Sequence, residues 1–191
     1  ELLDRAVELF RRRGFNGTST AELVDELGVN RKSMYAEFGS KQELFEAALE
    51  HYDRNHLTRL LAPIEAADAG VDEIREAFAG YASASEGWFR GRGCLMCNTA
   101  VERGALDPAS GRFAAAYLDR INRAFGHALE NGQGAGDLDE TADLDDMAAF
   151  LTTLLIGVAA SIRAEAPPEQ LHATSRAVSN ILDMHQAAIG R

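Results

Sequence analysis

Two cysteines form the pair of residues with the clearest potential for chemistry in this sequence. Cys94 and Cys97 stand three residues apart in GRGCLMCNTAVE, after a glycine-rich turn and near the expected start of a helix. A helix N-terminus and the nearby Arg90 and Arg92 lower thiol pKa values and favour the nucleophilic thiolate. The alternative is that both cysteines pack as small buried apolar residues. A four-ligand zinc site is not expected, because the chain has only 2 cysteines and its 5 histidines show no ligand spacing.

The second group of interest is cationic. Both lysines of the chain, Lys32 and Lys41, lie in VNRKSMYAEFGSK, together with Arg31 and one acid, Glu37. The whole chain carries a formal net charge of -11, whereas proteins that bind nucleic acids usually have a basic surface. A DNA contact would therefore have to be local to this stretch.

A further basic run, Arg11-Arg12-Arg13, ends the first expected helix. Cations there interact favourably with the helix dipole. Contact with a DNA backbone is the alternative role.

The elements around the cationic stretch are short helices with clear end signals. Ser19-x-x-Glu22 has the form of a capping box, and Gly28 can supply the positive φ that ends a helix of about nine residues. Asn30 then caps a second short helix that Gly39 closes, and Ser40-x-x-Glu43 opens a third. Two short helices joined by a tight turn indicate a helix-turn-helix, whose second helix enters the major groove. The candidate DNA contacts are Thr20, Asn30, Arg31, Lys32, Ser33, Tyr35 and Lys41.

The stretch GFNGTSTAELVDELGVNRKSMYAEFGSKQELF resembles the N-terminal DNA-binding domain of TetR-family transcriptional regulators. The resemblance implies phosphate contacts from Thr20, Tyr35 and Lys41, and base or backbone contacts from residues 30–33. Two positions depart from the family pattern, because Lys32 stands where a glycine is common and Glu37 where a histidine is common. A carboxylate repels phosphate, so we expect no DNA contact from Glu37.

The rest of the chain also has helical periodicity, which predicts an all-α fold. We expect a helix over 41–60 and others over 71–89, 93–105, 108–131, 142–164 and 167–189, divided into a DNA-binding domain, 1–46, and an effector-binding and dimerisation domain, 47–191. By resemblance, the last two helices pair with their symmetry copies, with Gly157, Ala160 and Ser161 permitting close approach. Burial in the core of one chain is the alternative. The predicted dimer contacts are Leu155, Val158, Val178, Ile181 and Leu182.

Effector contacts are expected among the aromatic, polar and thiol side chains of the second domain. Aromatic residues line pockets and cores alike, so packing in the core is the alternative for each of them. The candidates are Trp88, Cys94, Cys97, Asn98, Tyr117, Arg120 and Phe150.

Together these features predict a homodimeric, cytoplasmic regulator that represses transcription from a palindromic DNA operator and responds to an unknown small molecule. We expect no enzymatic activity, no cofactor, no metal and no membrane contact, since no apolar run approaches the roughly 18 residues of a membrane span. The chain opens at Glu1 within a helical pattern, so we expect the natural protein to extend further.

Two other classes of function remain open. An all-helical thiol oxidoreductase would use Cys94 and Cys97 with Glu102, although no histidine lies between His56 and His127. The second class is a helical small-molecule-binding protein whose helix-turn-helix no longer binds DNA.

Overall fold

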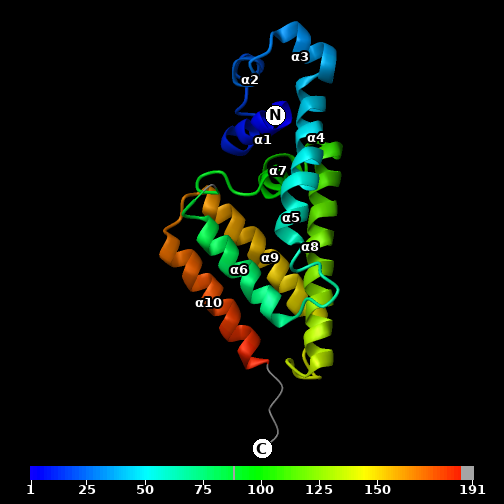
Figure 1. Cartoon of the computed structure of the whole chain (residues 1–191), viewed down its shortest axis with the longest axis vertical. Helices are drawn as coiled ribbons and strands as arrows, with labels where there is room; N and C mark the ends of the chain where they lie inside the picture. Colours follow the sequence, from blue (N-terminus) through cyan, green and yellow to red (C-terminus); the bar gives the residue numbers. More distant parts are fainter. Residues whose placement is uncertain (88, 186–191) are drawn as a thin grey trace, which may run out of the picture. The chain divides into compact units, whose positions relative to one another are not determined.

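The chain folds into helices (Figure 1), which group into two compact units by their contacts. The structure is a computed structural model that describes residues 1–87 and 89–185. Unit 1 comprises residues 1–59 and 92–117, and unit 2 comprises the described residues of 60–91 and 118–191. No strand occurs in the described ranges, which confirms the all-α prediction. The predicted domain boundary between residues 46 and 47 stays a prediction.

Unit 1 begins with four helices that enclose an apolar core. These are α1 (Leu2–Arg13), α2 (Thr20–Leu27), α3 (Arg31–Phe38) and α4 (Lys41–Tyr52). The rings of Phe10 and Phe45 meet edge to face with centroids 4.8 Å apart, which joins α1 to α4. Leu23 of α2 and Met34 of α3 are each buried. Burial of one face of each helix therefore holds the two short helices in place.

The ends of these helices follow the capping signals of the sequence. Ser19 accepts a hydrogen bond from the main-chain N–H of Glu22, and the Glu22 carboxylate accepts one from the N–H of Ser19, which completes the predicted capping box. Gly28 ends α2 in the left-handed region, with φ 66°. The Asn30 side chain caps α3 by accepting from the N–H of Ser33 at 2.8 Å. The predicted helix-turn-helix is confirmed in its secondary structure.

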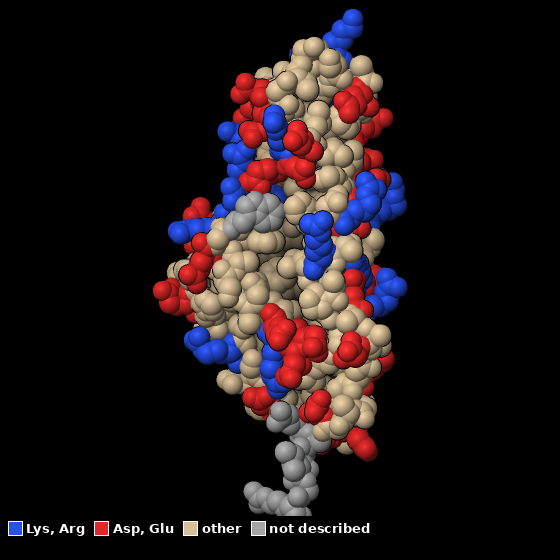
Figure 2. Space-filling view, viewed as in Figure 1, with Lys and Arg blue, Asp and Glu red and all other residues tan. Residues whose placement is uncertain are grey.

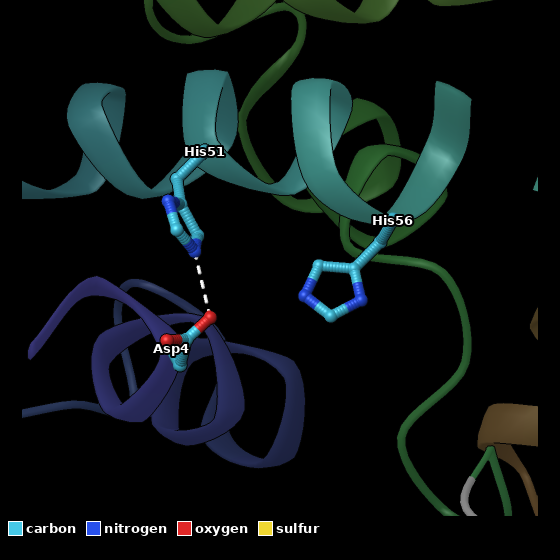
Figure 3. Close-up of side chains that lie close together, drawn as sticks. All are labelled: Asp4, His51 and His56. Carbon is cyan, nitrogen blue, oxygen red and sulfur yellow. Dashed lines mark hydrogen bonds and ion pairs between the residues drawn. The ribbon is translucent and has the colours of Figure 1, made fainter. Parts of the chain in front are cut away.

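The helix expected over residues 41–60 is interrupted by a wider turn. After α4, residues Asp53–Leu57 form a π-helix, and Thr58–Leu61 form α5. Apolar periodicity does not distinguish a single π turn from α-helix, so the π turn could not be predicted from the sequence. The turn places His51 and His56, five residues apart, toward the same side of the helix (Figure 3).

Unit 1 is completed by α7 (Leu95–Arg103) and the first part of α8 (Pro108–Ala135), and α7 packs against α1 and α4. Cys94 is the N-cap of α7, with extended φ and ψ of -92° and 129°. Several residues of α7 are buried, among them Leu95, Met96 and Thr99. The helix thus contributes to the same core as the first four helices.

Unit 2 contains α6 (Val71–Ala84), the second part of α8, α9 (Leu144–Arg163) and α10 (Pro168–Met184). Helix α10 packs against α6 and α9, and the rings of Phe78 and Phe125 stack at 5.9 Å between α6 and α8. The prediction for α6 continued to residue 89, whereas the helix ends at Ala84. Ile189, in the predicted last helix, lies outside the described residues.

Helix α9 corrects the expectation that no segment of the chain is long and apolar enough to span a membrane. By length and composition it could cross a membrane, with a mean hydropathy of 1.5 over an 18-residue window. Leu151, Leu155 and Ile162 of this helix are nevertheless buried within unit 2, where α9 packs against α6 and α10. The window is 44% buried within the chain, so packing accounts for part of the apolar composition of α9.

Candidate nucleic-acid interface

The first turn of α3 presents an exposed polar and cationic surface. Asn30, Arg31, Lys32 and Ser33 are all exposed. Among the described residues, neither Arg31 nor Lys32 forms an ion pair with a carboxylate, so both cations are available to an external anion. On the face drawn in Figure 2, acidic and basic side chains are scattered among other residues, and basic side chains project where Figure 1 places α3. The local positive charge predicted for an acidic chain is therefore accessible.

Two of these side chains also make contacts within the protein. The Oδ1 of Asn30 is engaged by the N–H of Ser33, so the amide nitrogen of Asn30 is the group left to contact a base or phosphate. The guanidinium of Arg31 lies over the ring of Tyr35 at 5.6 Å from its centroid. This stacking orients Arg31 at the start of the recognition helix.

The predicted phosphate-binding residues come together from three helices. The hydroxyl groups of Thr20 in α2 and Tyr35 in α3 lie 3.4 Å apart. The hydrogen bond to Thr20 and then the one to Arg31 lower the pKa of Tyr35 below its usual value. The ammonium of Lys41 lies 4.2 Å from the ring centroid of Phe15, and burial followed by repulsion from Arg103 lowers the pKa of Lys41. Thr20 and Tyr35 thus offer two neighbouring hydroxyl groups and Lys41 offers a cation, all of which are suited to phosphate oxygens.

The basic run at the end of α1 does not form part of this surface. Arg11 is fully buried, and its guanidinium donates two hydrogen bonds to the carbonyl oxygen of Gly93, at 2.7 and 3.1 Å. The DNA-backbone alternative is therefore wrong for Arg11. Arg12 pairs with Glu26 at 3.1 Å and Arg13 with Glu22 at 2.6 Å, so intramolecular carboxylates largely offset their charges.

Cys94 and Cys97 are free, buried thiols that face a common hydroxyl group. Their Sγ atoms lie 3.5 and 3.9 Å from the hydroxyl oxygen of Tyr117. Burial raises the pKa of Cys94, but hydrogen bonds with Cys97 and Tyr117 outweigh it and bring that pKa down to about 6. The hydrogen bond with Cys94 and then burial raise the pKa of Cys97. The two thiols therefore form an asymmetric pair, with Cys94 as the more acidic member.

Of the other predicted effector residues that the structure describes, only Asn98 shares the location of Cys94, Cys97 and Tyr117. Asn98 lies near the thiols, with its amide nitrogen donating to the carbonyl oxygen of Arg92 at 2.8 Å. In unit 2, Arg120 is paired with the carboxylate of Glu65, and Phe150 is 45% exposed on α9. Trp88 lies outside the described residues. The predicted set is therefore divided between the two units.

The structure corrects the predicted dimer contacts. Leu155, Val158, Val178 and Leu182 are buried within a single chain, so they form core and not outer surface. Ile181 alone of the five is partly exposed. An apolar pattern around most of a helix shows that the helix has several neighbours, but it does not show which face meets the chain's own core.

A cluster of Asp4, His51 and His56 has the residue types of a metal site (Figure 3). The Nε2 of His51 lies 2.7 Å from the carboxylate of Asp4, and its Nδ1 lies 3.1 Å from the side-chain nitrogen of Asn55. An amide nitrogen only donates, so Nδ1 is the acceptor and Nε2 carries the proton that the carboxylate accepts. A metal on Nε2 would require the opposite tautomer. The arrangement fits a hydrogen bond between α1 and α4 better than a metal centre.

Sequence reasoning missed the contacts that α7 makes with the helix-turn-helix. The carboxylate of Glu102 accepts hydrogen bonds from the main-chain N–H groups of Phe15 and Asn16, at 3.0 and 2.7 Å. The guanidinium of Arg103 lies 3.8 Å from the ring centroid of Phe15 and donates to Gln42 at 2.9 Å. These partners are between 61 and 88 positions away in sequence, so no local pattern could reveal them. Glu102 is committed to the loop before α2, which also removes it from the role that a thiol oxidoreductase would require.

Comparison with known proteins gives consistent matches over both units. Residues 2–48 match the family model for bacterial regulatory proteins of the tetR family, and residues 70–178 match that for the tetracyclin repressor-like C-terminal domain. The HTH-type transcriptional regulator YezE of Bacillus subtilis is 30% identical over 151 residues, 78% of each chain. The HTH-type transcriptional repressor ComR of Escherichia coli is 30% identical over 173 residues, 88% of this chain and 81% of ComR. The transcriptional regulator CifR, solved as a cysteine mutant complexed with 26 bp operator DNA, superposes with a TM-score of 0.82 at 27% identity over 94% of each chain.

Proposed function

Because this chain belongs to the TetR family of DNA-binding transcriptional regulators, we propose that it is a repressor that binds a palindromic operator as a homodimer. The observation that carries the proposal is the exposed first turn of α3, where Arg31 and Lys32 pair with no carboxylate of the described residues although the chain as a whole is acidic. Arg and Lys in this position bond guanine acceptors in the major groove. ComR is named a repressor, and CifR was solved on operator DNA, which supports the same role here.

The phosphate contacts proposed for this chain are Thr20, Tyr35 and Lys41, and the base or backbone contacts are residues 30–33. Thr20 begins α2 and Lys41 begins α4. Free main-chain N–H groups and the helix dipole favour an anion at each of these helix starts. The two helix starts flank α3 in sequence and would hold the DNA backbone while α3 reads the bases.

The dimer surface that we propose is the outward face of α9 and α10, in place of the five residues first expected. Small and apolar side chains at spacings of three and four residues remain exposed along both helices. Small residues let two helices approach closely, and a two-fold pair would place two recognition helices about 34 Å apart, one turn of DNA. The exposed residues of this stripe are Ala149, Phe150, Thr153, Gly157 and Ala160 on α9, and Ala173, Ala177 and Met184 on α10.

Repression and response to an effector complete the proposal, with the cytoplasm as the place of action. An effector must bind one arrangement of the recognition helices better than another, because only differential affinity shifts a population. The hollow of about 380 Å³ beside Phe150 and Ile181 is an alternative to the thiol region as an effector site. An effector that binds there would act through α9 and α10 and thus through the proposed dimer.

The experiment that tests the function is selection of bound fragments from a genomic library by the purified protein. We expect recovery of a short inverted repeat, with affinity that falls steeply with salt concentration. Recovery of no preferred sequence, or equal binding by a variant in which Arg31 and Lys32 are both Ala, would contradict the proposal.

A further inference from the structure

We propose that Cys94 and Cys97 form a peroxide-reactive dithiol, and that closing their disulfide loosens the hold of α7 on the helix-turn-helix. The proposal assigns a modification site and a class of reagent, small hydroperoxides, to two residues whose chemistry the DNA-binding role does not use. Its effect on DNA rests on the proposed function, whereas its thiol chemistry does not.

The first step of the argument is the position of the pair at the start of α7. Cys94 is the N-cap and has extended backbone angles, while Cys97 lies within the first turn of the helix. A disulfide needs Cβ atoms about 3.5–4.5 Å apart, whereas residues three apart in a continuous helix have them about 5–6 Å apart. Because Cys94 precedes the helix, its φ and ψ can change to close this gap without breaking α7. A bridge would therefore tighten the junction between Gly93 and α7.

The second step concerns the chemical surroundings. Both sulfur atoms lie near the hydroxyl group of Tyr117, which can donate to a thiolate. Burial lowers the pKa of the Arg11 guanidinium, and the charge on nearby Cys94 opposes that shift, so the attraction between the two groups also favours the Cys94 thiolate. With its pKa of about 6, Cys94 has the thiolate character of a nucleophile at neutral pH. Burial of both side chains restricts the reagent to small molecules such as hydrogen peroxide.

The reaction consists of two displacements. The Cys94 thiolate attacks one peroxide oxygen, the O–O bond breaks, and the leaving alkoxide or hydroxide takes up the proton that Cys94 released. The Cys97 sulfur then attacks the sulfur of the resulting sulfenic acid, the S–O bond breaks, and the departing hydroxide takes the Cys97 proton as water. The two thiols lose two electrons in total, and the hydroperoxide gains them as it becomes an alcohol or water.

The third step is the path from the thiols to the helix-turn-helix. The carbonyl oxygen that accepts from Arg11 of α1 belongs to Gly93, the residue next to Cys94. At the other end of α7, Glu102 holds the N–H groups of Phe15 and Asn16 in the loop before α2. A tighter junction at Gly93 would displace both contacts together, because the one continuous helix α7 connects them. These two contacts hold α1 and the loop before α2, and that helix and loop orient α2 and α3.

Thiol chemistry is tested first, on the purified full chain treated with hydrogen peroxide. We expect both thiols to be lost together, the intact mass to fall by two hydrogen atoms, and dithiothreitol to restore both. In Cys97→Ser the reaction should stop at a Cys94 sulfenic acid, which dimedone captures. Persistence of both thiols in the wild type, or dimedone labelling at Cys97 in Cys94→Ser but none at Cys94 in Cys97→Ser, would overturn the assignment.

Coupling is tested by hydrogen exchange, which needs no DNA. The amides of Phe15 and Asn16 should lose protection in the disulfide form and regain it on reduction. Glu102→Gln serves as the matched control, because it weakens the same contact without changing the sulfurs: those amides should exchange faster even when reduced, while the disulfide still forms. Unchanged exchange on oxidation would refute the coupling.

Operator binding is the last arm, measured on the fragment recovered by genomic selection. Oxidation should weaken wild-type binding by about tenfold, within the usual range of allosteric coupling. A Cys94→Ser, Cys97→Ser double variant should bind equally with and without peroxide; if it does not fold, Cys97→Ala, which also cannot form the bridge, takes its place. A variant without the bridge that responds to peroxide like the wild type would overturn the proposal. If the reduced protein selects no DNA at all, the proposed function fails, while the mass and exchange measurements still decide the thiol site.

Discussion

The guanidinium of Arg11 and the main-chain carbonyl of Gly93 are joined by two hydrogen bonds across 82 positions of sequence. Arg11 also lies over the ring of Tyr52, with its Cζ atom 5.7 Å from the ring centroid. One buried side chain thus connects α1, α4 and the start of α7 in unit 1. From the sequence, Arg11 at the end of α1 is explained by its interaction with the helix dipole. In the structure, its side chain makes a tertiary contact.

Arg11→Leu should lower the free energy of unfolding by about 1–3 kcal/mol, because it leaves the buried Gly93 carbonyl without its donor. Arg11→Lys keeps the charge and can retain one donor, so it should lose less. Urea denaturation of both variants beside the wild type measures the difference. Equal stability of Arg11→Leu and the wild type would show that the contact contributes nothing net.

Arg31→Ala and Lys32→Ala should each weaken specific DNA binding by about 1–3 kcal/mol where the side chain reads a base. Binding to unrelated DNA should change less, since base contacts specify the sequence. Fluorescence anisotropy at a fixed salt concentration measures both affinities. Arg123→Ala is the matched control: it removes one exposed arginine of unit 2 and should leave the ratio of the two affinities unchanged.

Lys41→Ala should weaken specific and non-specific binding alike, because a phosphate contact carries no sequence information. The slope of log affinity against log salt concentration should become shallower by about 1. Lys41→Arg keeps the charge at the start of α4 and should keep the slope. A large loss confined to the operator would instead make Lys41 a base-reading residue.

Gly157→Glu should give a folded monomer with poor operator affinity. A Cβ atom at Gly157 meets no atom of the chain within 4 Å, and replacing Gly in a helix interior gains about 0.5–1 kcal/mol, so the protomer should remain stable. Two glutamates forced together across a two-fold interface oppose association. Sedimentation velocity distinguishes monomer from dimer, with Gly157→Ala as the control that should still dimerise. Leu155→Glu, by contrast, should unfold the protomer, because Leu155 is buried.

The contact between Asp4 and His51 should make a small, pH-dependent contribution to stability. The hydrogen bond from His51 holds the pKa of Asp4 at about 2, below the value of about 3.9 for an unfolded chain. A carboxyl group with a lowered pKa stabilises the fold above its unfolded pKa, and the contribution disappears as pH falls through about 2. Asp4 is 54% exposed, so the effect should not exceed about 1 kcal/mol. Unfolding of Asp4→Asn and wild type at pH 6 and pH 3 should show a gap that narrows at the lower pH.

The helix-turn-helix could be predicted from sequence because its signals are local. A capping box joins residues three apart, and Gly28 adopts the left-handed backbone that ends α2. Asn30 caps α3, the helix that it precedes. Such contacts depend on neighbours within one turn, so a linear pattern carries them. The exposure of residues 30–33 could also be predicted, since the first turn of α3 faces solvent when its apolar residue, Met34, is buried.

What sequence alone determined is therefore the type and order of the helices, the family resemblance and the surface of α3. Tertiary structure decided which apolar residues of α9 and α10 are core, that Arg11 is buried, and that Glu102 holds the loop before α2. It also placed Tyr117 beside both thiols. Apolar periodicity shows that a helix has an apolar face, but it does not show which element packs against that face. The position of a charged residue in the sequence likewise does not predict a partner 80 or more positions away. Those choices depend on how helices distant in sequence pack together, which only the folded chain specifies.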